Sequence, residues 1–197
     1  MNFIHKLSET DPLQAFALSF APKDLRETLA LLYVSFYEWH HIVKTASEPM
    51  IGQIKIQWWR DMLIADKAPE GAPPHIDALH HFLKTQPHYK TDILNILDAL
   101  DEEFIFETAP AKKALGSFML FLITLHGLNN KSLNDLALHI FLDPHHNCSK
   151  HKEQKIPKNI RHLFFVYMSD GTEKSLWDNI KLITKILRFS WTGHYKY

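Results

Sequence analysis

The stretch that decides the fold is Ser47-Glu48-Pro49-Met50-Ile51-Gly52-Gln53-Ile54-Lys55-Ile56-Gln57-Trp58-Trp59-Arg60. It is typical of a helix, because Ser47 is a good N-cap, Glu48 favours the positive end of the helix dipole and proline is tolerated in the first turn. At about 100° per residue, one apolar side is expected to hold Ile51, Ile54, Trp58 and Met62. The same side is expected to be extended by Ile56, Trp59 and Leu63. We predict a mostly buried helix that ends near residue 65, with Trp58 at its structural centre and one narrow polar edge.

Helical spacing also dominates the rest of the chain, which has six glycines, few segments of period two and no internal repeat. Asp11-Pro12 is typical of a helix start, and Pro22 opens a longer helix that reaches about Val43. Further helices are expected over residues 76–83, 89–104, 111–128 and 132–142, and from Pro157 and Thr172 onward, with a polar loop at 143–155. Because no Gly/Ser-rich or Pro-rich linker divides the chain, we predict one all-α domain over residues 1–197 with eight or nine helices.

Composition excludes several classes of function and location. The chain has 22 basic and 22 acidic residues, so no global field favours a nucleic-acid partner. Cys148 is the only cysteine, which rules out an intramolecular disulfide and favours a reducing compartment. Residues 1–10 lack the apolar core of a secretory signal, and the longest apolar run, 115–125, is about half of the ~20 residues that a membrane span needs. We expect a cytoplasmic protein without a transmembrane segment, and peripheral contact with the inner face of a membrane stays open.

Several short motifs between residues 11 and 63 resemble the squalene/phytoene synthase family. They are Asp11-Pro12, Phe20-Ala21-Pro22, Leu32-Tyr33, Ser47-Glu48-Pro49 and Gln57-Trp58-Trp59-Arg60. The resemblance is closest to the bacterial phytoene-synthase-like branch, which is related to a mitochondrial complex I assembly factor. It implies an isoprenoid-synthase-like helical shell, shortened here in its second half, around an apolar cavity. That cavity is expected between the Tyr33 helix and residues 115–125, close to Phe16, Tyr33 and Tyr37.

The same resemblance identifies what this chain lacks. Active members of the family hold Mg²⁺ and a diphosphate between two Asp-rich motifs. The aspartates of the first motif would fall at His40, His41 and Lys44, and imidazole and ammonium groups are poor ligands for a hard cation. An arginine usual in the family falls at Tyr37, and the second motif falls near 141–147, where Asp143 is the only carboxylate. We therefore expect no cofactor and no Mg²⁺-dependent prenyl transfer, but a binding or assembly-type factor for a lipid-like or isoprenoid molecule or a protein partner.

Two clusters and one lysine leave alternatives open. The residues of the first cluster share one helical face and could form a displaced Mg²⁺ site. The protein would then be an active trans-prenyltransferase that condenses isoprenoid diphosphates head to head. The simpler interpretation is a solvated acidic helix end. It consists of Asp98, Asp101 and Glu102. The second resembles a compact zinc set, but chance clustering in a chain with 14 histidines is the favoured interpretation. It consists of His145, His146, Cys148 and His151. We expect Lys55 to cover apolar surface with its stem rather than to contact a diphosphate or lipid headgroup.

Overall fold

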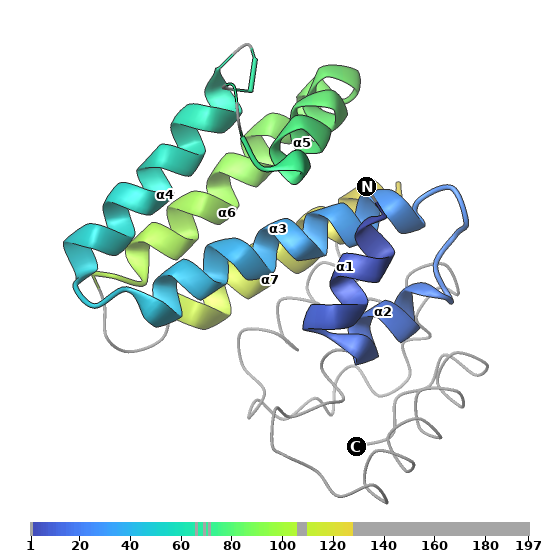
Figure 1. The fold of residues 1–197 in the computed structure, drawn as a ribbon, viewed down its shortest axis with the longest axis horizontal. Helices are drawn as coiled ribbons and strands as arrows, with labels where there is room; N and C mark the ends of the chain where they lie inside the picture. Colours follow the sequence, from blue (N-terminus) through green and yellow to red (C-terminus); the bar gives the residue numbers. More distant parts are fainter. Residues whose placement is uncertain (1, 66, 69, 71, 106–109, 128–197) are drawn as a thin grey trace, which may run out of the picture.

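The computed structural model describes residues 2–65, 67–68, 70, 72–105 and 110–127. Over these residues the chain forms seven α-helices and one 3₁₀ helix and contains no strand, so the predicted all-α class is confirmed (Figure 1). The helices are α1 (Phe3–Thr10), α2 (Pro12–Leu18), α3 (Arg26–Thr45), α4 (Pro49–Ile64), α5 (Pro74–Thr85), η1 (Pro87–Tyr89), α6 (Lys90–Glu102) and α7 (Pro110–Leu125). The helices expected beyond residue 128, and the loop at 143–155, lie outside the described residues.

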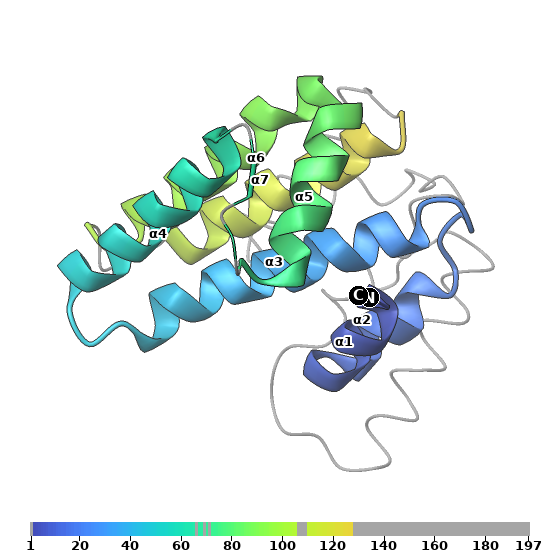
Figure 2. The same cartoon turned by 45° about the horizontal axis from the view of Figure 1, so that its top comes forward.

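The long helix α3 is the centre of the structure. Every residue from Leu29 to Phe36 is buried, because α3 has neighbours on several sides. Helices α1 and α2 pack against one side of it, and α4, α5, α6 and α7 cover the others (Figures 1 and 2). Helices α6 and α7 lie side by side, and α4 runs along the far side of α6, at the edge of the array. Among the described residues, no helix combines the length and apolar character needed to cross a lipid bilayer.

Local sequence explains where the first two helices begin. Asn2 caps α1, since its side-chain oxygen accepts a hydrogen bond from the backbone N–H of His5 at 2.9 Å. Asp11 caps α2 in the same way and accepts from the backbone N–H of Gln14 at 2.9 Å, with Pro12 in the first turn. The predicted start at Asp11-Pro12 is therefore confirmed. Helix α1 was not expected from the sequence, because it buries only Phe3 and Leu7.

Helix α4 has the predicted length but not the predicted orientation. Its buried face consists of Gly52, Ile56, Trp59 and Leu63. Of the apolar side expected to be buried, Ile56, Trp59 and Leu63 are buried as predicted. The prediction is wrong for Ile54 and Trp58, which are 62% and 42% exposed. The expected N-cap is also wrong: Glu48 occupies that position and makes no side-chain capping hydrogen bond. The apolar residues of α4 span a wide arc of the helix, so the packing partners α3, α5 and α6 determine which part of that arc is buried.

Candidate binding groove

A groove of about 620 Å³ runs along the carboxyl-terminal half of α3. One wall comes from α1 and the residue that follows it, with Lys6, Thr10 and Asp11. The remaining lining residues are Val34, Tyr37, Glu38, His40, His41, Ile42 and Lys44 of α3, and Trp59 of α4. Aromatic and aliphatic side chains therefore stand beside charged ones, a combination that suits an amphipathic ligand.

Asp11 joins the start of α2 to α3. While one of its oxygens caps α2, the other accepts a hydrogen bond from the Tyr37 hydroxyl at 2.8 Å. Burial raises the pKa of the Tyr33 and Tyr37 hydroxyls above the ordinary tyrosine value, and the nearby Asp11 carboxylate raises both further. Both phenols thus keep their protons at neutral pH. The side-chain amide of buried Gln14 acts in the opposite direction on the pKa of the Tyr33 hydroxyl, but burial and Asp11 outweigh it.

Glu38 links three helices through one carboxylate. One oxygen lies 2.6 Å from Lys6 Nζ of α1, and the other lies 2.7 Å from Nε2 of His75 in α5. Burial acts to raise the pKa of this carboxyl, but the contacts with His75 and Lys6 outweigh burial and hold it below its usual value. His75 is 2% exposed and stands against the ring of Trp59, with 5.4 Å between ring centres. Sequence reasoning missed this set, because Lys6 and Glu38 are 32 residues apart and neither belongs to a motif.

The three residues at the first Asp-rich motif all line the groove, but they do not share one orientation. His40 stacks on Phe36, with 5.8 Å between ring centres, and burial together with nearby Lys44 lowers its pKa. His41 and Lys44 are exposed. At neutral pH this part of the groove carries a neutral imidazole and a free ammonium, whereas a diphosphate–Mg²⁺ site requires carboxylates.

The pocket residues expected from the resemblance are separated in the structure. Only Tyr37 lines the groove. Phe16 lies on the exposed side of α2 and packs edge-on against Phe20, while Tyr33 is buried with its ring edge on Phe118 of α7. Phe118 also stacks on Phe36 at 4.3 Å between ring centres. Aromatic rings of α3 and α7 thus meet close to the place where the cavity was expected, and the groove described above lies on the α1 side of α3.

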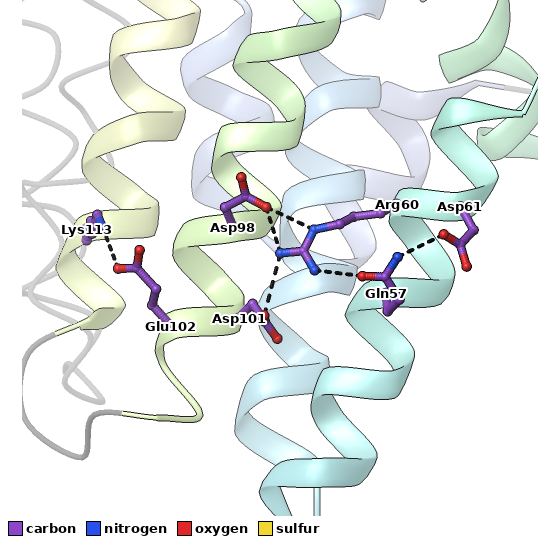
Figure 3. Close-up of polar contacts among 7 residues, drawn as sticks. All are labelled: Gln57, Arg60, Asp61, Asp98, Asp101, Glu102 and Lys113. Atoms are coloured by element: carbon purple, nitrogen blue, oxygen red, sulfur yellow. Dashed lines mark hydrogen bonds and ion pairs between the residues drawn. The ribbon is translucent and has the colours of Figure 1, made fainter.

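The acidic cluster on α6 is occupied by bases from neighbouring helices (Figure 3). Arg60 of α4 donates to Asp98 from Nε at 2.9 Å, its Nη2 lies 2.7 Å from the same carboxylate, and Asp101 is 3.7 Å away. Gln57 accepts a hydrogen bond from Arg60 and donates one to Asp61, which extends the network along α4. Glu102 turns away and pairs with Lys113 of α7 (Figure 3). The cluster thus fastens α6 to α4 and α7, and none of its carboxylates lines the groove.

The remaining candidates from the sequence are Lys55, the zinc-like set and the second Asp-rich position. Lys55 is exposed on α4 and is not a groove residue. The zinc-like set at residues 145–151 and the second Asp-rich position at 141–147 lie outside the described residues. Among the residues that the structure describes, no group of three or more histidine, cysteine, aspartate or glutamate side chains is arranged to hold a metal ion.

Comparison with known proteins identifies one family. The model of squalene/phytoene synthase matches residues 8–110, which include every groove residue except Lys6. No curated protein and no solved structure matches the chain.

Proposed function

Because the chain belongs to the squalene/phytoene synthase family, we propose that it is a member without Mg²⁺-dependent prenyl transfer, a single-domain protein that acts as a binding or assembly-type factor. The observation that carries this proposal is the chemistry at the first motif. His40, His41 and Lys44 line the groove on α3 at the positions where carboxylates would be needed to hold Mg²⁺. A relation to the bacterial phytoene-synthase-like branch, and through it to a complex I assembly factor, belongs to the same proposal.

The proposed site of binding is the groove along α3. Its floor offers Val34, Tyr37 and Ile42, and its rim offers Lys44 and His41, which suits a lipid-like molecule or an apolar segment of a protein partner. Binding of this kind depends on buried area rather than on a metal. We place the proposed ligand in this groove, because the rings of Tyr33, Phe36 and Phe118 are packed together between α3 and α7.

The alternative function, head-to-head condensation of isoprenoid diphosphates, would need other metal ligands. The candidates that the sequence offers are Asp98 and Asp101, and Arg60 already pairs with them. Recruiting them to Mg²⁺ would require breaking this contact between α4 and α6. It would also leave the guanidinium, whose side chain is 15% exposed, without its carboxylate partners. The geometry therefore favours the binding function.

Calorimetry distinguishes the two functions. Titration of Mg²⁺ and farnesyl diphosphate, separately and together, should give no heat that requires both. A variant with His40→Asp, His41→Asp and Lys44→Asp is the matched control, because it restores three carboxylates and should gain Mg²⁺-dependent diphosphate binding. Micromolar Mg²⁺-dependent binding by the unaltered chain, abolished by Asp98→Asn with Asp101→Asn, would overturn the proposal.

Occupancy of the groove needs a separate, metal-free test. Farnesol, which has the apolar chain without the diphosphate, should bind weakly and equally well with Mg²⁺ or with a chelator. Thr10→Trp places a large ring at the wall of the groove and should weaken this binding about tenfold, whereas Ile64→Ser, on an exposed and distant part of α4, should not change it. Equal binding by all three proteins would place the ligand elsewhere.

A further inference from the structure

Helix α1 is the wall of the groove with the fewest anchors. It supplies Lys6 and Thr10 to the lining, yet only Phe3 and Leu7 of its eight residues are buried. An isolated helix of this length does not persist in water, because so few hydrogen bonds cannot offset the cost of starting the helix. Helix α1 therefore keeps its form only while its contacts with α2 and α3 hold it in place.

Two hydrogen bonds join α1 to α3 among the described residues. The backbone N–H of Phe3 donates to Glu27 at 3.3 Å, which is a long contact, and the Lys6 ammonium donates to Glu38 at 2.6 Å. Lys6 and Glu38 also line the groove. Their ion pair thus connects the α1 wall of the groove directly to its α3 wall.

Glu38 is held in position from α5. Its second carboxylate oxygen lies 2.7 Å from Nε2 of His75, whose side chain is 2% exposed and packs against the ring of Trp59. Helix α5 packs on α3 and α4, so this contact does not depend on α1. When Lys6 moves away, Glu38 keeps its place, and the flexible lysine is the movable partner of the ion pair.

Asp11 is the point about which α1 can turn. It is the single residue between α1 and α2. One of its carboxylate oxygens caps α2, and the other accepts a hydrogen bond from the Tyr37 hydroxyl at 2.8 Å. Helix α2 is anchored further by buried Gln14, Ala17 and Leu18. A movement of α1 about Asp11 therefore leaves α2 in place.

We propose that α1 is a gate of the groove. It opens by turning about Asp11, and the ion pair of Lys6 with Glu38 is the latch that holds it closed, with His75 as the positioning residue of the latch. An ion pair of two partly exposed groups shifts an equilibrium by about threefold, which favours the closed gate and still lets it open often. The inference deepens the proposed function and rests on it for the ligand that the gate admits.

Native-state proteolysis tests the latch without a ligand. Thermolysin cleaves before leucine in an accessible chain, and Leu7 is 0% exposed, so cleavage there requires the release of α1. When cleavage is slow relative to closing, its rate is proportional to the open population. Lys6→Met should raise this rate about threefold, and Lys6→Arg should leave it close to that of the parent. Dividing each rate by that of the same chain unfolded in urea removes the effect of the substitution on the protease.

Glu9→Gln is the matched control on the same helix. It removes the contact of Glu9 with His5 at 3.6 Å, in which both side chains are exposed and both belong to α1. Because this contact does not reach α3, its loss should change the cleavage rate much less than Lys6→Met does.

The positioning role of His75 has its own test. His75→Phe keeps a ring against Trp59 but cannot hold Glu38, so it should also raise the cleavage rate before Leu7. Its effect should largely disappear in combination with Lys6→Met, because both substitutions remove the same latch. Independent, additive effects would reduce His75 to a packing residue and contradict this role.

Stopped-flow binding of farnesol tests the gate itself. Trp59 lines the groove, so tryptophan fluorescence reports occupancy. A weaker latch opens the gate more often both for entry and for exit. Lys6→Met should therefore raise the association and dissociation rate constants about threefold each and leave the Kd nearly unchanged.

The gate is overturned if thermolysin cleaves Lys6→Met before Leu7 at the parent's rate, or if Glu9→Gln has an equal effect. It is also overturned if Lys6→Met accelerates cleavage within α6 as much, because that result would show a general loss of stability. The proposed function fails separately: farnesol would bind neither the parent nor any variant, while the cleavage rates would still differ as expected. Farnesol binding with rate constants that Lys6→Met leaves unchanged would contradict the gate alone.

Discussion

The ring of Phe104 lies against Gly52 so closely that a β-carbon at position 52 would overlap it. Glycine is therefore needed for close contact between α4 and the end of α6. We expect Gly52→Ala to displace the ring and to lower the free energy of unfolding by about 1–3 kcal/mol. Urea denaturation measures the loss. The double variant Gly52→Ala with Phe104→Leu should lose less free energy of unfolding than the sum of the losses of the two single variants. A loss equal to that sum or larger would contradict this account.

The two adjacent tryptophans of α4 should differ sharply in their contribution to stability. Trp59 is buried between Trp39 and His75, so Trp59→Ala should cost roughly 3–5 kcal/mol. Trp58 is 42% exposed, and its replacement by alanine should cost about 1 kcal/mol. Chemical denaturation of the pair gives the comparison directly. Equal losses would mean that the orientation of α4 described above is wrong.

Arg60 should stabilise the contact between α4 and α6 by a modest amount. Its guanidinium spans Asp98, Asp101 and Gln57, but Asp98 is largely exposed and solvent screens the pair. We expect Arg60→Ala to cost about 1 kcal/mol and Arg60→Lys to recover little of it, because an ammonium cannot reproduce the planar fork. The measurement is the urea midpoint at low and high salt. Lys113→Ala, which removes the more exposed pair with Glu102, is the control and should cost less.

Glu103 should make stability depend on pH. Its carboxyl has a pKa of about 7 in the folded protein because burial raises it, with Lys44 acting in the opposite direction. The folded state therefore binds this proton more tightly than the unfolded chain, and stability falls as the pH rises from about 4.5 through 7. For a half-buried group, solvent screening reduces the effect to about 1 kcal/mol.

The Glu103→Gln variant isolates this effect from the titration of the histidines. It should be more stable than the parent at pH 8 and no more stable at pH 5, as measured by urea denaturation at both values. Glu48→Gln, at an exposed carboxyl, is the control and should give the same difference from the parent at both pH values. An advantage for Glu103→Gln that does not change with pH would rule out ionisation as its cause.

Local sequence was sufficient to predict the helices that carry their own start signals. Asp11-Pro12 and Pro49 mark the beginnings of α2 and α4, and the capping geometry of Asp11 is present as expected. Helix α1 also has a start signal, because Asn2 caps it, but its eight residues bury only Phe3 and Leu7 and its pattern is too short to predict a helix by itself. It is held instead by α3 through Phe3, Leu7 and the ion pair of Lys6 with Glu38, which are contacts between residues distant in sequence.

The candidate site was harder to predict, because it too depends on contacts between residues that are distant in sequence. The replacement of the first Asp-rich motif by His40, His41 and Lys44 could be recognised in the sequence, and the three residues do line one groove. The contact of Phe118 with Phe36 joins residues far apart in the sequence, and Asp98 of the α6 cluster pairs with Arg60, which is 38 residues away. Neither relationship has a periodicity or a spacing that a sequence pattern could display.

Helix α1 forms a wall of the groove, so a change in its local opening can report whether a ligand occupies the groove. Lys6 and Thr10 stand at the edge of the groove, and a short helix with few buried side chains is a segment expected to open locally. A ligand that fills the groove would contact this wall and lower the frequency of opening. Amide hydrogen exchange in residues 3–10 should therefore slow when the groove is occupied, which allows candidate ligands to be screened before the natural one is identified.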